Sequence, residues 1–306
     1  MKKNLVKKAV LPVFVALLCS VIALTSVSYA WFTMGNKASV EQLELSVTSA
    51  SGMQVSATGN EGTFKSVISL ADLTAQGTSN QMPTKDNEGQ FDFAFTPVST
   101  TDTLSSNLHK FWTGTVKDNG AVEYAAEASG AKNYMYFDLY FKSNGGQTLY
   151  FDISSTVADS TTNDKNTSLG MRVSFVYFGS SQKPGTVDGG ITNLTSTATK
   201  AVIWEPNATE HTQDALNRGA TAGSKATAYG VDPTGTKTAI TLPEAVSKTI
   251  DQTSVAGLKI ADMTQGYHKV RVYIWLEGED IDCANDISGG SVLVNLSFFQ
   301  APTSAN

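Results

Sequence analysis

The chain has 306 residues, a formal net charge of −6 and three histidines. Four of its 22 basic residues and none of its 28 acidic ones lie in the first thirty positions, which leaves 18 against 28 and a formal charge of −10 for the remainder. This balance argues against nucleic acid or an anionic membrane surface as partner, because both select clustered lysine and arginine. Cys283 is the single cysteine after position 30, so that part of the chain cannot form an internal disulfide.

The first thirty residues predict an export signal. Four lysines in the first eight positions precede an apolar run over 9–27, and the small residues Ser28 and Ala30 follow it. We expect a general signal peptidase to cut between Ala30 and Trp31. The alternative is that the run is retained as a single membrane anchor, because its length is near the roughly 20 residues of a spanning helix. Either way, the rest of the chain is expected outside the cytoplasmic membrane, secreted or attached to the cell surface.

Period-two alternation of apolar and polar residues is the main structural signal, and it predicts strands with one buried face. It occurs over 43–47, 53–55, 135–141, 149–153, 171–177, 270–276 and 292–298. Because Asn144, Gly145 and Gly146 tolerate positive φ, residues 134–154 are predicted to form a β-hairpin. Helical signals are few, and short helices are expected within 66–75, 212–218 and 241–251.

Many strands with turn-rich connections and little helix predict an all-β chain. We expect an antiparallel β-sandwich, jelly-roll-like, with long loops at 76–130 and 179–260 and one or two short helices. The strand pattern resumes after each loop without a change in character. Residues 31–306 are therefore predicted to form a single decorated domain.

Two segments resemble a known family. The join from Ser28 to Thr33, Ser-Tyr-Ala-Trp-Phe-Thr, leads directly into an alternating strand and resembles the secreted matrix proteins of the TasA and camelysin family. The segment from Tyr136 to Gly146, a strand that ends in Asn-Gly-Gly, is similar to a strand of that family. The resemblance implies a jelly-roll domain exported by a SipW-type peptidase and polymerised into extracellular fibres in a biofilm matrix of Gram-positive type.

The resemblance also implies assembly by strand donation, in which the freed N-terminal segment of one copy completes the sheet of the next. An extended segment can do this because it supplies main-chain hydrogen bonds while alternate side chains fill pockets. The side chains available for this here are Trp31, Phe32, Val40, Leu43, Leu45 and Val47. The alternative is that 43–47 is an ordinary first strand of its own sandwich, since an amphipathic strand pairs within its own chain by default.

Catalytic motifs are not found. His109, His211 and His268 stand far apart and outside any His-Glu-x-x-His pattern, although camelysin-type relatives are described as metallopeptidases. His211 and His268 are expected at surface or capping positions. With no nucleophile elbow and no phosphate loop either, the chain is not expected to be an enzyme.

An acidic cluster in the segment between the last two strands is the best candidate site. It consists of Glu277, Glu279, Asp280, Asp282 and Asp286. Calcium takes six to eight oxygen ligands and a flexible loop can wrap it, so a calcium site is one interpretation. The other is a solvated acidic loop without any cofactor, because the spacing does not match an EF-hand.

Exposed aromatic residues offer an alternative function, a monomeric surface adhesion module that binds a glycan or another ligand. Tyr134, Tyr136 and Tyr140, with Tyr273 and Trp275, lie on strand faces opposite the predicted core. Large bare apolar patches are rare, so we expect loops to cover these faces. Cys283 is expected to be a small, partly buried filler.

Overall fold

The fold is seen in a computed structural model, which describes residues 38–48, 53–74, 95–100, 104, 108–116, 122–128, 133–152, 154–161, 164–181, 201–217, 220–223, 258–283, 287 and 289–302. The described elements are β1 (Ser39–Thr48), β2 (Gln54–Ser56), η1 (Glu61–Thr63), β3 (Val67–Ser69), α2 (Leu70–Thr74), β4 (Trp112–Val116), β5 (Val122–Ala126), β6 (Tyr134–Phe151), β7 (Thr156–Asp159), η2 (Thr167–Gly170), β8 (Met171–Ser181), β9 (Val202–Trp204), α3 (Gln213–Asn217), β10 (Leu258–Leu276) and β11 (Ser291–Pro302).

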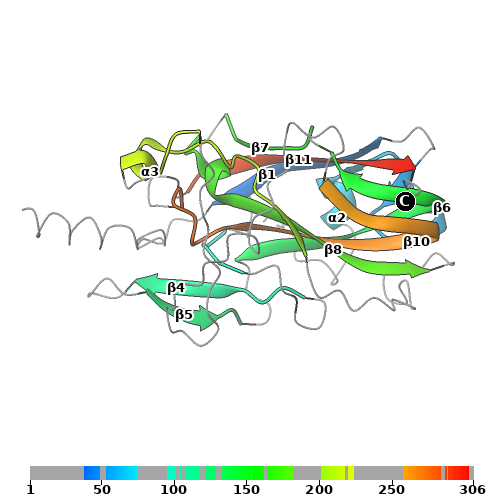
Figure 1. The fold of residues 1–306 in the computed structure, drawn as a ribbon, viewed down its shortest axis with the longest axis horizontal. Helices are drawn as coiled ribbons and strands as arrows, with labels where there is room; N and C mark the ends of the chain where they lie inside the picture. Colours follow the sequence, from blue (N-terminus) through cyan, green and yellow to red (C-terminus); the bar gives the residue numbers. More distant parts are fainter. Residues whose placement is uncertain are drawn as a thin grey trace, which may run out of the picture.

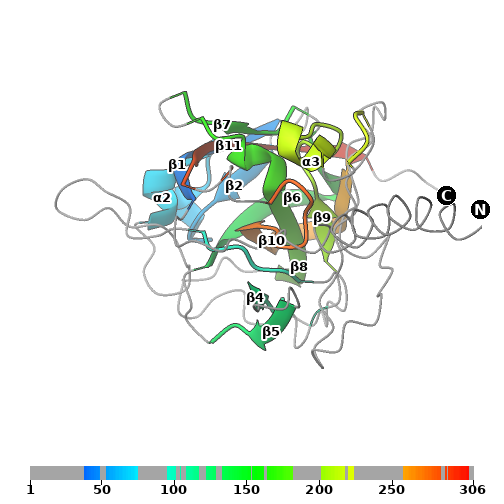
Figure 2. The ribbon, with the colours of Figure 1, turned by 90° about the vertical axis from the view of Figure 1, so that its left-hand side faces the viewer.

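The chain is an all-β sandwich, as its sequence predicts. Nine strands form one continuous hydrogen-bonded sheet in the order β3-β1-β11-β6-β10-β8-β9, with β2 added to β6 and β7 added to β11. This sheet folds over itself, so that β1, β7 and β11 lie in one layer and β8 and β10 in the other (Figures 1 and 2). A small β4–β5 sheet lies beyond the β8–β10 layer, inside the predicted long loop 76–130.

The predicted hairpin over 134–154 is wrong. Residues Tyr134–Phe151 form one strand, β6, and β10 pairs with both halves of it. Gly145 and Gly146 have φ of 90° and 65°, but they form an irregularity opposite a register shift in β10 instead of a chain reversal. A Cβ at position 145 would stand 2.9 Å from the backbone nitrogen of Gln265, so the close approach of β10 requires glycine there.

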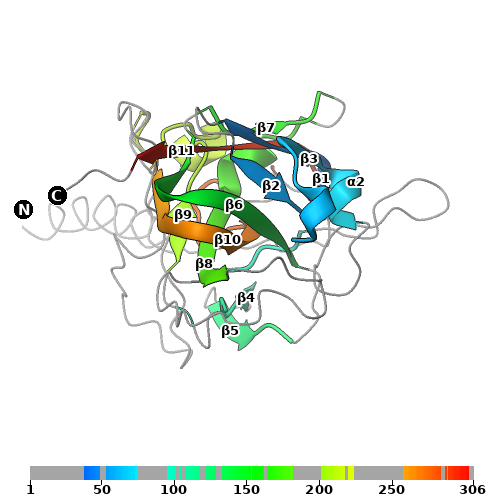
Figure 3. The same cartoon turned by 90° about the vertical axis from the view of Figure 1, so that its right-hand side faces the viewer.

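The long strands β6 and β10 join the two layers. In its middle, at 140–142, β6 pairs with β2, and near its end it pairs with β11, while β10 follows it throughout (Figure 3). The sandwich core fills the space between the layers. Its side chains come from the predicted alternating segments, and the largest fully buried ones include Phe137, Phe141, Phe151, Phe175 and Phe298. Cys283 is fully buried in the same core, as a filler residue would be.

Strand β1 differs from the predicted antiparallel arrangement. It lies between β3 and β11 and runs parallel to β11, the last strand of the chain. Its four apolar side chains, Val40, Leu43, Leu45 and Val47, are all buried. Trp31 and Phe32 lie outside the described residues.

The predicted helices agree with the structure where it describes them. Helix α2 lies within 66–75 and α3 within 212–218. The third predicted helix, 241–251, lies outside the described residues, as do the export signal and its cleavage site at Ala30. No helix in the described part of the chain is long and apolar enough to cross a membrane.

Candidate functional site

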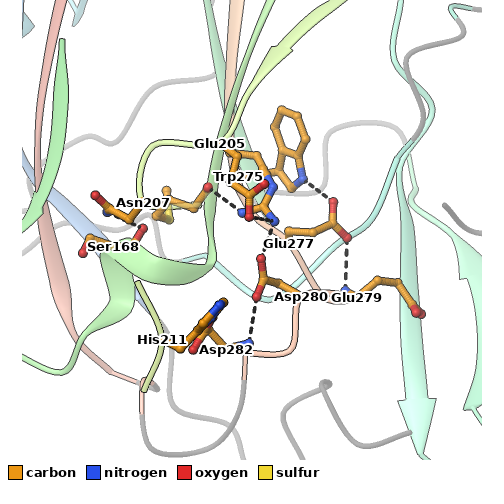
Figure 4. A network of polar contacts seen from close by, with 11 residues as sticks. Ser168, Glu205, Asn207, His211, Trp275, Glu277, Glu279, Asp280 and Asp282 are labelled. Carbon is orange, nitrogen blue, oxygen red and sulfur yellow. Dashed lines mark hydrogen bonds and ion pairs between the residues drawn. The ribbon is translucent and has the colours of Figure 1, made fainter. Parts of the chain in front are cut away.

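The predicted acidic cluster surrounds a buried arginine that the sequence analysis missed. Arg172, near the start of β8, is completely buried, and its Nη2 donates to Glu205 Oε1 at 2.8 Å (Figure 4). The same nitrogen donates to the Asp280 carboxylate, and Nη1 donates to the carbonyl of Met171 at 3.0 Å. The guanidinium thus joins β8, the end of β9 and the β10–β11 connection. We call Arg172, Glu205, Glu277 and Asp280 the arginine cluster.

Glu277 is the second fully buried carboxyl of the β10–β11 connection. Its Oε2 accepts from Trp275 Nε1 at 3.0 Å, and its Oε1 accepts from the backbone N–H of Glu279 at 3.1 Å (Figure 4). Burial raises the pKa of Glu277 to about 7, although the charge of Arg172 and these hydrogen bonds act in the opposite direction. The cluster therefore holds one permanent cation against three carboxyl groups, one of which is readily protonated.

Asp282 fixes a neighbouring segment. Its Oδ2 lies 2.7 Å from Nδ1 of His211, and its Oδ1 accepts from the backbone N–H of Thr212 at 2.7 Å. Burial raises the pKa of Asp282, and the charge of Asp280 adds to that effect. Thr212 caps α3 by accepting from the N–H of Ala215 at 3.0 Å. The carboxylate thereby ties the start of α3 to the connection.

The structure does not bring the predicted calcium ligands together around one point. Glu279 accepts from the Tyr124 hydroxyl, away from the Arg172 contacts, and Asp286 lies outside the described residues. Among the residues that the structure describes, no group of three or more metal-binding side chains is arranged to hold an ion. The solvated-loop interpretation is wrong for Glu277, Asp280 and Asp282, since each is at most 1% exposed. The calcium site stays a prediction.

The predicted covering of the aromatic faces is confirmed for Tyr140, Tyr273 and Trp275, whereas Tyr134 and Tyr136 are half-buried. Tyr273 and Trp275 are buried beneath Val98 and Phe111, and Phe111 stacks on Tyr134 with ring centroids 4.0 Å apart. Tyr140 is also buried, beside Tyr267 and Phe64. Trp275 and Tyr140 are therefore core residues, and their replacement by alanine would reduce stability before it tested any ligand.

The histidines are more buried than expected. His268 is fully buried, with Nδ1 2.9 Å from the Tyr177 hydroxyl and Nε2 2.8 Å from the carbonyl of Thr264, so its predicted surface position is wrong. His109 Nε2 lies 2.7 Å from the hydroxyl of Ser174, a serine–histidine contact that sequence spacing gave no way to find. Ser174 is fully buried, and this contact fastens the segment before β4 to β8.

Comparisons with known proteins identify no relative. The chain matches no protein-family model, and neither the curated proteins nor the solved structures contain a match. The functional argument therefore rests on the sequence and on the contacts described above.

Proposed function

We propose that this protein is an exported structural component of the cell surface or extracellular matrix whose copies associate by exchanging strand β1. The observation that carries the proposal is the position of β1. The strand that begins at Ser39, soon after the predicted cleavage site at Ala30, lies between β3 and β11 and contributes four buried side chains to the core. Such a strand is suited to donation, because its removal opens a slot that an identical strand from another copy fills.

The energetics of exchange favour this strand. It pairs with β11 from Ser39 to Thr48 in one parallel register, with a single irregularity between Val40 and Gln42. When an identical element is exchanged between copies, every one of these contacts is kept, and the cost is mainly that of association. Five residues separate β1 from β2, a short connection at which the strand can leave its own sheet.

The outer contacts of β1 are compatible with either location of the strand. Ser39 and Ser46 face Ser291 and Ser297 of β11, with Oγ–Oγ distances of 2.9 Å in both pairs. These serine pairs would form in the same way whether β1 belonged to the same copy or to another. The slot is thus specified by the apolar pockets on one side and by main-chain hydrogen bonds along the strand.

The arginine cluster supports a structural function over a catalytic one. Arg172, Glu205, Glu277 and Asp280 are each at most 1% exposed, so a substrate has no path to them in this conformation. Their contacts connect strands and loops at one end of the sandwich. A rigid end of this kind suits a subunit that must bear load within an assembly.

The proposal is tested on protein recovered from its native surface. Intact mass and N-terminal sequencing are measured together with size exclusion before and after denaturant. We expect a chain that begins at Trp31, in high-mass material that denaturant dissociates. A chain that retains residues 1–30 and remains in the membrane fraction would contradict the proposal, and it would favour the alternative of an anchored surface module that binds a ligand.

Deleting residues 31–48 would test assembly and stability at the same time. The deletion removes Val40, Leu43, Leu45 and Val47 from the core, so it is expected to destabilise the sandwich as well as to prevent assembly. Adding the missing segment back as a separate peptide separates the two effects. A peptide of residues 38–48 is expected to restore the melting temperature of the truncated chain, and failure to do so would show that the slot does not accept a strand in trans.

A further inference from the structure

Cations and aromatic rings alternate on the outer face of the β8–β10 layer, further along the strands from Trp275. The Arg271 guanidinium lies 4.6 Å from the ring centroid of Tyr136 and 5.5 Å from that of Phe178. The Lys269 ammonium lies 5.3 Å from the ring centroid of Phe178 and 5.7 Å from that of Tyr140. We call these five side chains the cation ladder. They come from β6, β10 and β8, which lie side by side in the sheet (Figure 3).

One carboxylate holds both cations of the ladder. Arg271 donates from Nε to Asp138 Oδ1 at 2.7 Å and from Nη2 to Oδ2 at 3.0 Å, and Lys269 Nζ lies 2.7 Å from Oδ2. Asp138 is the direct cross-strand partner of Arg271, and its side chain is 3% exposed. The three groups together carry one excess positive charge in a fixed geometry.

The ladder remains accessible from one side. The side chains of Lys269 and Arg271 are 16% and 15% exposed, and the rings of Tyr136 and Phe178 are half-buried. An ammonium group carries three N–H donors, and the contact with Asp138 uses one of them. Both cations are therefore held in place by Asp138 while part of each side chain remains in contact with solvent.

We propose that the cation ladder is a binding site for an acidic glycan, a polysaccharide whose sugars carry carboxylates. The local charge selects such a ligand, because two cations share one carboxylate in the ladder and leave one excess positive charge there, although the chain after position 30 has a formal charge of −10. The chemistry matches as well. Lysine and arginine form charge-assisted hydrogen bonds with carboxylates, and aromatic rings contact the apolar faces of sugars. The site does not depend on exchange of β1, so either proposal can fail without the other.

The test is retention of residues 31–306 on immobilised polygalacturonate, with dextran as the neutral comparison. The wild-type protein is expected to bind polygalacturonate and not dextran, and salt should weaken the binding. Lys269→Gln should weaken it by about tenfold or more, the factor that corresponds to one lost charge-assisted contact. Phe178→Ala should also weaken it, because it removes a ring that contacts the sugar. Lys269→Arg keeps the charge and should retain binding.

Lys259→Gln is the matched control. Lys259 also lies on β10 and pairs with an aspartate, Asp262, but its side chain is 55% exposed and it is not part of the ladder. This variant removes the same charge and should leave retention unchanged. Equal losses for Lys259→Gln and Lys269→Gln would overturn the proposal in favour of nonspecific attraction, and so would equal binding of the wild type to both polysaccharides. Melting temperatures of all variants identify any loss that is due to unfolding.

Discussion

The arginine cluster and the cation ladder are both built from ion pairs, but carboxyl groups outnumber the cation in the cluster and cations outnumber the carboxylate in the ladder. In the cluster, one guanidinium pairs with two carboxylates and feels the charge of a third carboxyl group, and all four side chains are sealed from water. In the ladder, one carboxylate meets two cations whose side chains remain partly exposed. Burial decides what each can do: the sealed group can only hold strands and loops together, whereas the partly exposed one has a charge and donors left for a ligand.

The largest expected effect is a loss of folding stability when the arginine cluster loses its cation. Arg172→Met leaves Glu205 and Asp280 buried without their cation, so it should cost about 3 to 5 kcal/mol in the free energy of unfolding. Urea unfolding measures the loss. The double variant Arg172→Met with Glu205→Gln should lose less than the sum of the single changes, because it removes one of the stranded charges. Strict additivity would show that the buried contact is not an energetic unit.

The next effect is a pH dependence of the cluster. The pKa of Glu277 in the folded chain, about 7, lies above its ordinary value of 4.5, so its contribution is fully present below pH 4.5 and is lost as the pH rises through 7. The loss is on the order of 3 kcal/mol by pH 8, since each pKa unit corresponds to about 1.4 kcal/mol.

Thermal unfolding of the wild type and of Glu277→Gln between pH 5 and pH 8 measures the effect of that carboxyl. The variant should lose less stability over this range, because it cannot ionise at position 277. Parallel curves for the two proteins would contradict the raised pKa. Exposed carboxyls such as Glu61, whose pKa is lowered by Lys142 and Tyr267, act in the opposite direction and are common to both proteins.

The ladder should tolerate changes better than the cluster. Asp138→Asn keeps the shape of the side chain but leaves the two cations without a counter-charge, and we expect a loss of about 1 to 2 kcal/mol. Differential scanning calorimetry measures it at low and high salt. A loss as large as that of Arg172→Met would mean that the ladder is as sealed as the cluster.

Lys269→Gln should have the smallest effect on stability. A partly exposed ion pair contributes about 1 kcal/mol or less, and Arg271 still holds Asp138 in place. The melting temperature should therefore change little while glycan retention falls. A large fall in melting temperature would assign Lys269 to the structural group and remove it from the proposed site.

Local patterns predicted the strands well because alternation reflects burial of one face of each strand. The segments 43–47, 171–177 and 292–298 all lie in strands whose apolar side chains face the core. The hairpin prediction failed because the glycines after Asn144 fit a turn and an irregular strand equally well. The choice depends on β10, whose pairing with β6 spans more than 100 positions along the chain.

The candidate sites were predictable only in part. The acidic residues of the β10–β11 connection are visible in the sequence, but Arg172 is 33 positions from Glu205 and 108 from Asp280. An arginine beside the apolar residues of a predicted strand was the available signal, because a charge at a buried position requires a partner. The sequence singled out Tyr136 and Tyr140 of the ladder, but Lys269, Arg271 and Phe178 gave no local signal, since the five side chains meet only when β6, β10 and β8 are paired.

Exchange of β1 is tested most directly by a cross-link between different copies. Ser46 and Ser297 face each other across β1 and β11 with their hydroxyls 2.9 Å apart, close enough for a disulfide after substitution, and Cys283 is too buried to compete. Chains carrying Ser46→Cys are unfolded and refolded together with chains carrying Ser297→Cys, then oxidised. The account predicts disulfide-linked heterodimers, because β1 of one copy lies beside β11 of another. Heterodimers no more abundant than in a mixture of separately refolded chains would contradict it and leave β1 as the first strand of its own sandwich.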